Sequence, residues 1–249
     1  MKNFFVHAIS KSFSCVLISA LLMFTVACSA QENSLVKQDS LPLMDCLKRS
    51  AVYLICNSNG DTANGVILNI TDHQLIIATN AHVAELFDES KNTAYAQSAE
   101  CFPAFLVDIL AVDKTKDLAF LTARTDALDA SLLDYICAAS YKDASYDDLE
   151  KGDILTCLYL DRIDPTGFFY PEASLGQAVL LDKNVPVQGF EENMMYLDYP
   201  SLSGMSGSGV FDQSGYLVGL ISAGDKKQGT MIAVPLPALL SGLNSASQP

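Results

Sequence analysis

The sequence predicts an all-β protein that consists of two antiparallel β-barrels packed together. Three observations carry this prediction. Short apolar runs rich in Val, Ile, Leu and aromatic residues alternate with turn residues along the chain. Long segments with helical periodicity are absent. An acidic segment without strand-like runs, Thr125–Lys151, divides the apolar runs into two blocks of roughly six strands each.

The N-terminal segment has the composition of an export signal. Lys2 and Lys11 precede an uncharged and mostly apolar run, Ser12–Ala27, which ends in small residues. This run is shorter than the roughly 20 residues that a membrane-spanning helix needs. Residues 1–27 are therefore predicted to be a signal peptide, and an uncleaved N-terminal anchor is the alternative interpretation.

The segment Thr25–Ala30 reads TVACSA and resembles the end of a bacterial lipoprotein signal. The resemblance implies that Cys28 is the lipidated first residue of a mature chain in the bacterial periplasm or cell envelope, anchored to the membrane. Thr25 departs from the Leu that is usual there, and ordinary cleavage after Ala30 is the competing interpretation. Residues 28–45 are predicted to be a polar tether.

The first barrel is expected within residues 46–125. Its strands are predicted in the apolar runs 51–56, 65–70, 75–83, 104–112 and 118–123. Residues 126–150 are acidic and rich in Ala, Ser and Tyr, so we expect them to link the two barrels, with a short helical turn.

The second barrel is expected within residues 151–249. Its strands are predicted in the runs 153–160, 173–181, 193–200, 207–212, 216–224 and 229–235. The remaining tail, residues 236–249, is predicted to contain a short C-terminal helix.

Charge and cysteine content exclude several classes of function. The net charge of −14 repels phosphate backbones and argues against nucleic-acid binding. The mature chain holds only two histidines and no Cys-x-x-Cys pair, so neither a zinc site nor a cofactor is expected. Apart from Cys15 in the signal and the candidate lipid site Cys28, five cysteines remain. They allow at most two intrachain disulfides, and free buried thiols are an equally good interpretation: Cys46, Cys56, Cys101, Cys137 and Cys157.

The segment Ser201–Gly215, SLSGMSGSGVFDQSG, is either a flexible linker or a tight loop that presents a serine nucleophile. A serine nucleophile needs a neighbouring base, usually His, and a buried carboxylate that orients the base. His73 lies in a polar turn, which suits a surface residue. His82 follows a strongly apolar run and is the better candidate.

Three segments resemble chymotrypsin-like (trypsin-like, PA clan) serine proteases, in particular the bacterial Deg-type branch. TNAHV matches the Thr-x-x-His-Val motif of the first barrel, DKTKDLAFL resembles the Asp segment, and GMSGSGVF resembles the Gly-x-Ser-Gly motif. The resemblance covers about residues 50–240 and implies a serine endopeptidase that acts on protein or peptide substrates. Its catalytic residues would be His82, Asp117 and Ser206, which are separated by 35 and 89 residues.

The same resemblance assigns the groups around the nucleophile. The N–H groups of Gly204 and Ser206 would form the oxyanion hole. Ser222 would support Asp117, and the segment Ser222–Gly224 would pair with an extended peptide substrate. The specificity pocket lacks an acid at its base, so we expect preference for small or medium apolar side chains rather than Lys or Arg. Its predicted lining is Pro200, Ser201, Ile221, Ala223 and Ala233.

Some features depart from the family pattern. Met205 stands where many digestive members have an Asp that pairs with a new N-terminus, and no Ile-Val-Gly-Gly start exists. We therefore expect other contacts to hold the oxyanion loop. The chain ends about forty residues after Ser206, so no PDZ domain is expected. The alternative function is a non-catalytic two-barrel binding or regulatory module in the bacterial envelope.

Overall fold

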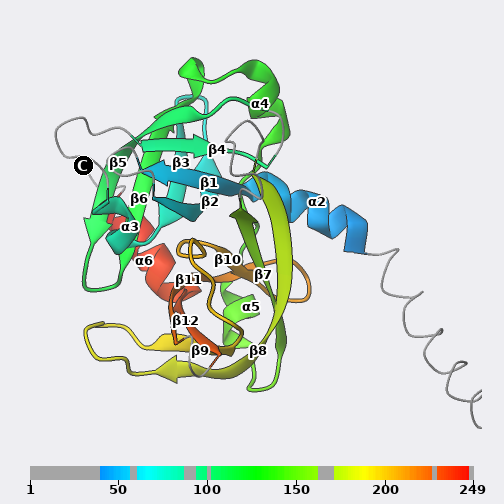
Figure 1. Ribbon diagram of the computed structural model, residues 1–249, viewed down its shortest axis with the longest axis vertical. Coiled ribbons are helices and arrows are strands. Elements are labelled where there is room, and N and C mark those ends of the chain that lie inside the picture. Colours follow the sequence, from blue (N-terminus) through cyan, green and yellow to red (C-terminus); the bar gives the residue numbers. More distant parts are fainter. Residues whose placement is uncertain are drawn as a thin grey trace, which may run out of the picture. The chain divides into compact units, whose positions relative to one another are not determined.

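The computed structural model describes residues 40–56, 61–86, 94–99, 102–161, 171–225 and 229–246. The chain divides into two units, Met1–Met44 and Asp45–Pro249, and the second unit contains all the described strands. These strands form two closed six-stranded antiparallel barrels (Figure 1), which confirms the predicted fold class. None of the helices in the described ranges is long and apolar enough to cross a membrane.

In the first barrel the strands follow the order β1-β2-β3-β6-β5-β4. Their bounds are β1 Ala51–Cys56, β2 Thr62–Ile70, β3 Gln74–Thr79, β4 Ala94–Gln97, β5 Phe105–Asp113 and β6 Leu118–Arg124. Five of these strands occupy the predicted apolar runs. The sequence analysis missed β4, because AYAQ is short and alternates small with polar residues.

In the second barrel the strands follow the order β10-β11-β12-β9-β8-β7. Their bounds are β7 Ile154–Asp161, β8 Glu172–Val185, β9 Met194–Asp198, β10 Gly209–Phe211, β11 Leu217–Asp225 and β12 Thr230–Pro235. The predicted C-terminal helix is α6, Leu236–Ala246. The link between the barrels contains three short helices where one turn was expected: η1 Thr125–Ala127, α4 Ala130–Tyr135 and α5 Asp143–Asp147.

A helix that the sequence analysis did not predict precedes the first barrel. Helix α2 spans Ser40–Ser50 and leads directly into β1, so the last residues of the predicted tether are helical. Pro42 lies in its first turn, where a missing N–H costs no hydrogen bond. The predicted signal, Cys28 and the rest of the tether lie outside the described residues.

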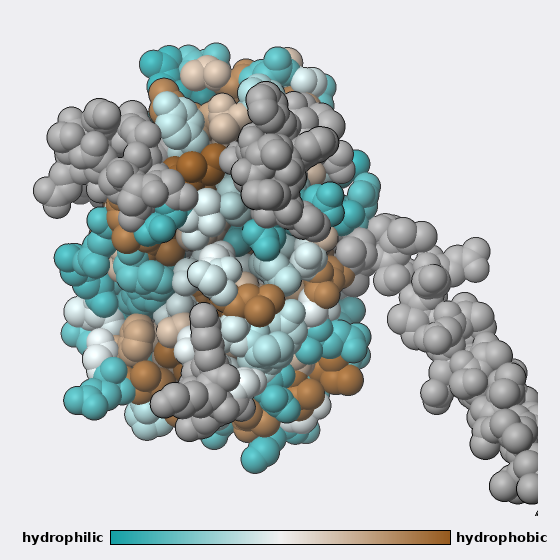
Figure 2. Space-filling model, viewed as in Figure 1, coloured by the Kyte–Doolittle hydropathy of each residue, from teal (hydrophilic) through white to brown (hydrophobic). Residues whose placement is uncertain are grey.

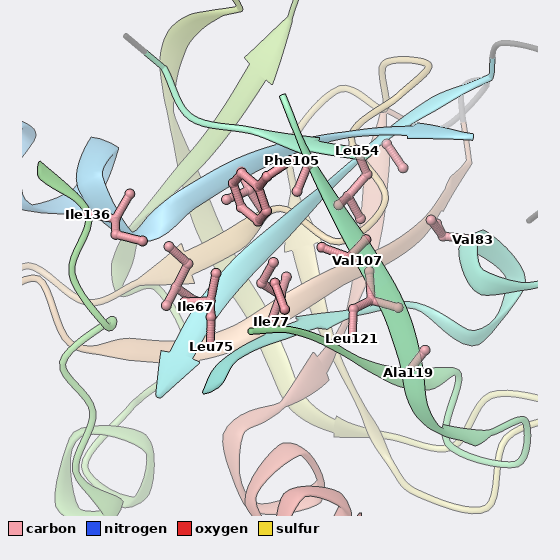
Figure 3. Packing of buried hydrophobic residues seen from close by; sticks show 14 of the residues in the cluster. Leu54, Ile67, Leu75, Ile77, Val83, Phe105, Val107, Ala119, Leu121 and Ile136 are labelled. Carbon is pink, nitrogen blue, oxygen red and sulfur yellow. The ribbon is translucent and has the colours of Figure 1, made fainter. Parts of the chain in front are cut away.

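The core of the first barrel consists mainly of aliphatic side chains that point inward from several strands (Figure 3). Leu54, Ile67, Leu75, Ile77 and Leu121 are all fully buried. Burying each of these side chains stabilises the fold by about 1.5–3 kcal/mol. The apolar runs of the sequence thus close into a barrel because one face of each strand is removed from water.

The two barrels contact each other around their facing loops. The N–H of Glu191, between β8 and β9, donates a hydrogen bond of 2.9 Å to the carbonyl oxygen of Thr115, between β5 and β6. Helix α6 packs on the first barrel so closely that a Cβ on Gly242 would lie 3.1 Å from the Phe120 ring. The outer surface in Figure 2 is mostly hydrophilic, with separated hydrophobic patches. The hydrogen bond between Glu191 and Thr115 thus holds the β8–β9 loop of the second barrel against the β5–β6 turn of the first barrel.

Candidate active site

His82 lies in the short helix α3, Ala81–Ala84, and not at the end of a strand as the sequence suggested. Strand β3 ends at Thr79, and the carbonyl oxygen of Asn80 accepts the N–H groups of Val83 and Ala84. The Asn80 side chain also donates a hydrogen bond of 3.2 Å to the carbonyl oxygen of Asp117. The His82 side chain is 45% exposed, so one edge of the imidazole is accessible to a substrate.

Asp117 lies in the turn between β5 and β6 and has a buried carboxylate. Its Oδ1 accepts the backbone N–H of His82 at 3.1 Å and lies 2.9 Å from His82 Nδ1. Its Oδ2 accepts a short hydrogen bond from the hydroxyl of Ser222. The φ of Asp117 is +51°, a conformation that costs energy for a residue with a Cβ.

Ser206 completes a continuous chain of hydrogen bonds across the two barrels. Its Oγ lies 2.9 Å from His82 Nε2. When Nδ1 of His82 carries the proton and donates a hydrogen bond to Asp117, Nε2 is the acceptor nitrogen and faces the serine hydroxyl. This arrangement can remove the hydroxyl proton as Oγ attacks an electrophile. The structure therefore brings His82, Asp117 and Ser206 into one chain of contacts.

Two glycines give the loop around Ser206 its shape. Gly204 has a φ of +87° and Gly207 a φ of +82°, conformations that favour glycine. At Gly207 a side chain is also excluded sterically, because a Cβ would lie 1.9 Å from the carbonyl oxygen of Asn64. The N–H of Gly207 donates to Ile221 at 2.9 Å, which ties the loop to β11.

Two backbone donors of this loop remain available. Within the part of the chain that the structure describes, the N–H groups of Gly204 and Ser206 donate no hydrogen bond to another residue. Met205, which lies between them, is buried at 1% exposure. A pair of unpaired N–H groups next to a nucleophile can stabilise a developing negative oxygen.

Strand β11 has an irregularity at Ser222. Ile221 pairs with Ala233 and Ala223 pairs with Ile232, so Ser222 has no partner in β12. This bulge turns the Ser222 hydroxyl toward Asp117 and places its carbonyl oxygen 3.4 Å from Ser206 Oγ. The sequence predicted Ser222 as a support for Asp117, but the bulge has no sequence signal.

The predicted substrate-binding residues fall into two groups. Ile221 and Ala233 lie opposite each other with exposures of 1% and 0%, so they belong to a buried row of side chains. Ser222 is also buried. The others, which are exposed or half-buried, are Pro200, Ser201, Ala223 and Gly224.

Ser201 and Gly224 are in close contact, because a Cβ on Gly224 would lie 2.4 Å from Ser201 Cβ. The N–H of Ile221 donates to the carbonyl oxygen of Ser208. After Ile221, β11 continues to pair with β12 along one of its edges. The exposed backbone of Ala223 and Gly224 forms the other edge.

The described residues contain no cluster of His, Cys, Asp and Glu that could hold a metal ion. Cys46, Cys137 and Cys157 are free thiols. Burial raises the pKa of the Cys157 thiol to about 12, so this thiol is protonated at neutral pH and is a poor nucleophile. Among the described residues, Ser206 is the serine whose hydroxyl lies beside an imidazole nitrogen.

Two closed barrels with a His–Asp–Ser array between them define the chymotrypsin-like fold. The trypsin-like peptidase domain matches residues 63–220, and the chain belongs to this family. This range includes all three residues of the array. No curated protein matches the chain.

Solved structures with the same fold are HtrA- and Deg-type proteases. The HtrA-type protease AlgW with a tripeptide is 19% identical, with a TM-score of 0.63 over 82% of this chain and 62% of that chain. Deg5 is 17% identical, with a TM-score of 0.62 over 81% of this chain and 90% of that chain.

An inactive serine-to-alanine mutant of Rv3671c from Mycobacterium tuberculosis H37Rv is 16% identical, with a TM-score of 0.60 over 87% of this chain and 95% of that chain. The chain therefore spans about three fifths of the AlgW structure and most of the other two. Identities in this range establish the fold alone.

Proposed function

We propose that the protein is an exported serine endopeptidase that hydrolyses peptide bonds through an acyl-enzyme intermediate. One observation carries the proposal: Ser206 Oγ, the His82 imidazole and the Asp117 carboxylate form a continuous hydrogen-bonded chain with contacts of about 3 Å. Membership of the trypsin-like peptidase family supports the same reaction class.

In the acylation step, Ser206 Oγ attacks the carbonyl carbon of the scissile bond while His82 Nε2 takes the hydroxyl proton. The protonated His82 then donates this proton to the nitrogen of the leaving amine. In the second step, His82 removes a proton from water as the water oxygen attacks the acyl carbon, and then returns this proton to Ser206 Oγ as the ester bond breaks and the carboxylic acid product leaves. Asp117 stays ionised, holds the imidazole in place and stabilises its positive charge.

The negative oxygen of each tetrahedral intermediate binds to the N–H groups of Gly204 and Ser206. Both donors lack another described partner, so no existing hydrogen bond has to break first. Removing one such donor typically lowers kcat by about 10²–10³. The mechanism uses no metal or cofactor.

We propose that the substrate is an extended segment of a protein or peptide, which adds as a strand to the edge of Ser222–Gly224. The residue before the scissile bond would be small or medium and apolar, because Pro200 and Ser201 carry no acid that could pair with Lys or Arg. A peptide library measures this preference. Cleavage mainly after Lys, Arg or Glu would contradict it.

The export proposal rests on the N-terminal sequence alone. Residues 1–27 would direct the chain to the bacterial periplasm or cell envelope, and a lipid on Cys28 would anchor it to the membrane. Labelled palmitate incorporated into the wild type but not into Cys28→Ala supports lipidation. Equal incorporation into both proteins, or none, would refute it.

The decisive experiment on the activity uses a fluorophosphonate probe, which reacts with an activated serine. We expect labelling and peptide hydrolysis by the wild type, and in Ser206→Ala no labelling and a kcat lower by about 10⁶. Ser214→Ala, an exposed serine in the turn after β10, is the matched control and keeps both properties. An unlabelled, inactive wild type would favour the alternative, a non-catalytic two-barrel binding module.

A further inference from the structure

A buried polar side chain near the site that has no assigned role makes three hydrogen bonds to the second barrel. Asn64 lies in β2 of the first barrel and is 1% exposed. Its Nδ2 donates to the carbonyl oxygen of Gly204 at 2.8 Å and to that of Leu160 at 3.1 Å. Its Oδ1 accepts the N–H of Leu160 at 2.6 Å. Both amide protons and the oxygen thus have partners in the second barrel.

The backbone of Asn64 also contacts the loop of the nucleophile. Its N–H donates a hydrogen bond of 2.8 Å to the carbonyl oxygen of Ser206. Its carbonyl oxygen accepts the hydroxyl of Thr79 at 2.8 Å and is the atom that excludes a side chain at Gly207. Side chain and backbone of Asn64 therefore fix two different points of one loop.

The two contact points lie on either side of the Ser206 N–H, one of the two proposed oxyanion donors. The carbonyl groups of Gly204 and Ser206 are both held by Asn64, and the peptide group that carries the Ser206 N–H lies between them in the chain. Because peptide groups are planar, fixing the groups on both sides restricts the direction in which this N–H points. The paired contacts with Leu160 hold the amide of Asn64 in one orientation.

Met205 occupies the position at which many digestive members of the family have an aspartate, so another contact has to hold this loop. A buried thioether cannot form an ion pair, so it cannot anchor the loop electrostatically. A buried amide with three hydrogen bonds can anchor the loop without introducing a charge. Losing this amide would leave the buried carbonyl groups that it satisfies without a donor.

We propose that Asn64 is the positioning residue that holds the oxyanion hole in its binding geometry before substrate arrives. This inference rests on the proposed peptidase function. Asn64 touches no reacting atom and acts through the Gly204–Ser206 loop. Its effect should therefore appear in the stabilisation of the tetrahedral state and not in the binding of the unreacted substrate.

The test compares Asn64→Asp with Asn69→Asp. Asn64→Asp preserves the size of the side chain and the acceptor for Leu160 but places a carboxylate against two carbonyl oxygens. Asn69 lies on the same strand and is exposed, so it is the matched control. We expect Asn64→Asp to lower kcat by about 10- to 100-fold with KM changed less than about threefold. Affinity for a peptide boronic acid, which forms a tetrahedral adduct with the serine, should fall by the same factor.

Asn64→Ser serves as a second variant if Asn64→Asp does not fold, and thermal unfolding is measured for every protein. A folded Asn64 variant with wild-type kcat and boronic acid affinity would overturn the inference, even when its melting temperature is lower. That result leaves the peptidase function intact, provided that the wild type reacts with the fluorophosphonate probe. A wild type that neither reacts nor hydrolyses peptides would overturn both proposals.

Discussion

At the scale of single residues, Asp117 combines backbone strain with a dense set of hydrogen bonds. Its φ of +51° belongs to the left-handed region, where a residue other than glycine costs of the order of 1 kcal/mol or more. Asp and Asn tolerate this region better than other residues. The hydrogen bonds that its carboxylate accepts from His82 and Ser222 explain why the strain is retained at this position.

Asp117→Asn separates the charge of this residue from its backbone conformation. Because Asn also tolerates a positive φ, the variant should fold like the wild type. Its amide cannot stabilise the His82 imidazolium and favours the wrong tautomer, so we expect kcat to fall by about 10⁴. Steady-state kinetics on a peptide substrate measures the effect.

The matched control for this variant is Asp113→Asn in the same turn. Asp113 Oδ1 accepts the N–H groups of Thr115 and Lys116, and an Asn side chain keeps that oxygen. Its kcat should stay within about threefold of the wild type, since turn substitutions that keep their hydrogen bonds have small effects. A folded Asp117→Asn variant with near-normal kcat would rule out the assigned role.

At the scale of elements, the loop around the nucleophile depends on the side chain beneath it. Met205 is buried at 1% exposure between two positions with defined roles. Met205→Leu conserves volume and should cost less than about 1.5 kcal/mol of stability, with activity retained. Met205→Asp restores the family residue without its N-terminal partner, so it buries an unpaired charge and should destabilise the fold strongly.

Urea unfolding and probe labelling of these two variants check the interpretation. If Met205→Asp were as stable and as reactive as Met205→Leu, an unrecognised cation would have to lie within reach of the loop, and the argument for Asn64 as its anchor would weaken.

The edge of β11 allows a prediction about substrate length. In Gly224→Ala the new Cβ would lie within 2.5 Å of both Cβ and Oγ of Ser201, so strand or pocket must move. We expect KM to rise about tenfold for peptides long enough to pair with this edge. The small fluorophosphonate probe needs no such pairing and should label the variant normally. A KM unchanged for long peptides would contradict the proposed binding edge.

The elements that the sequence predicted well are those whose signal is local. Eleven strands and α6 coincide with apolar runs bounded by turn residues. Strand β4 and helices α2 and α3 were missed because four to eleven residues of mixed polarity carry little periodic signal. The candidate triad was found through its motifs.

The contacts of Asn64 could not be predicted from the sequence. Its partners Leu160 and Gly204 lie 96 and 140 residues away, and nothing in the local sequence ANGV indicates them. The bulge at Ser222 likewise depends on the register between β11 and β12, which only the closed barrel defines. Contacts between the barrels and the register within the second barrel therefore determine the part of the site that the motifs leave open.

At the scale of the whole molecule, one group buried in the second barrel and one in the link between the barrels couple stability to pH. Cys157 in β7 is fully buried, which raises the pKa of its thiol from 9.0 to about 12. Tyr146 in α5 has its pKa raised to about 12, chiefly by burial and also by the charges of Asp147 and Asp182. Both groups hold their protons more tightly in the folded protein than in the unfolded chain.

The sign of the linkage follows from these two shifts. Below pH 9 both groups are protonated in either state, so their contribution to stability is fully present. Above pH 9 the unfolded chain releases the Cys157 proton while the folded protein keeps it, and the unfolded state is favoured. The free energy of unfolding should therefore fall between pH 9 and about 12, with up to about 1.4 kcal/mol per pH unit from Cys157.

Urea unfolding at a series of pH values from 8 to about 11 measures this slope. Cys157→Ala should be less stable than the wild type at pH 8, because it leaves a small cavity, but its stability should fall less steeply with pH. Cys46→Ala removes an exposed thiol and should keep the wild-type slope. If Cys157→Ala and Cys46→Ala lost stability in parallel, the Cys157 thiol would have to ionise as readily in the folded protein as in the unfolded chain, and its place in the core of the second barrel would be wrong.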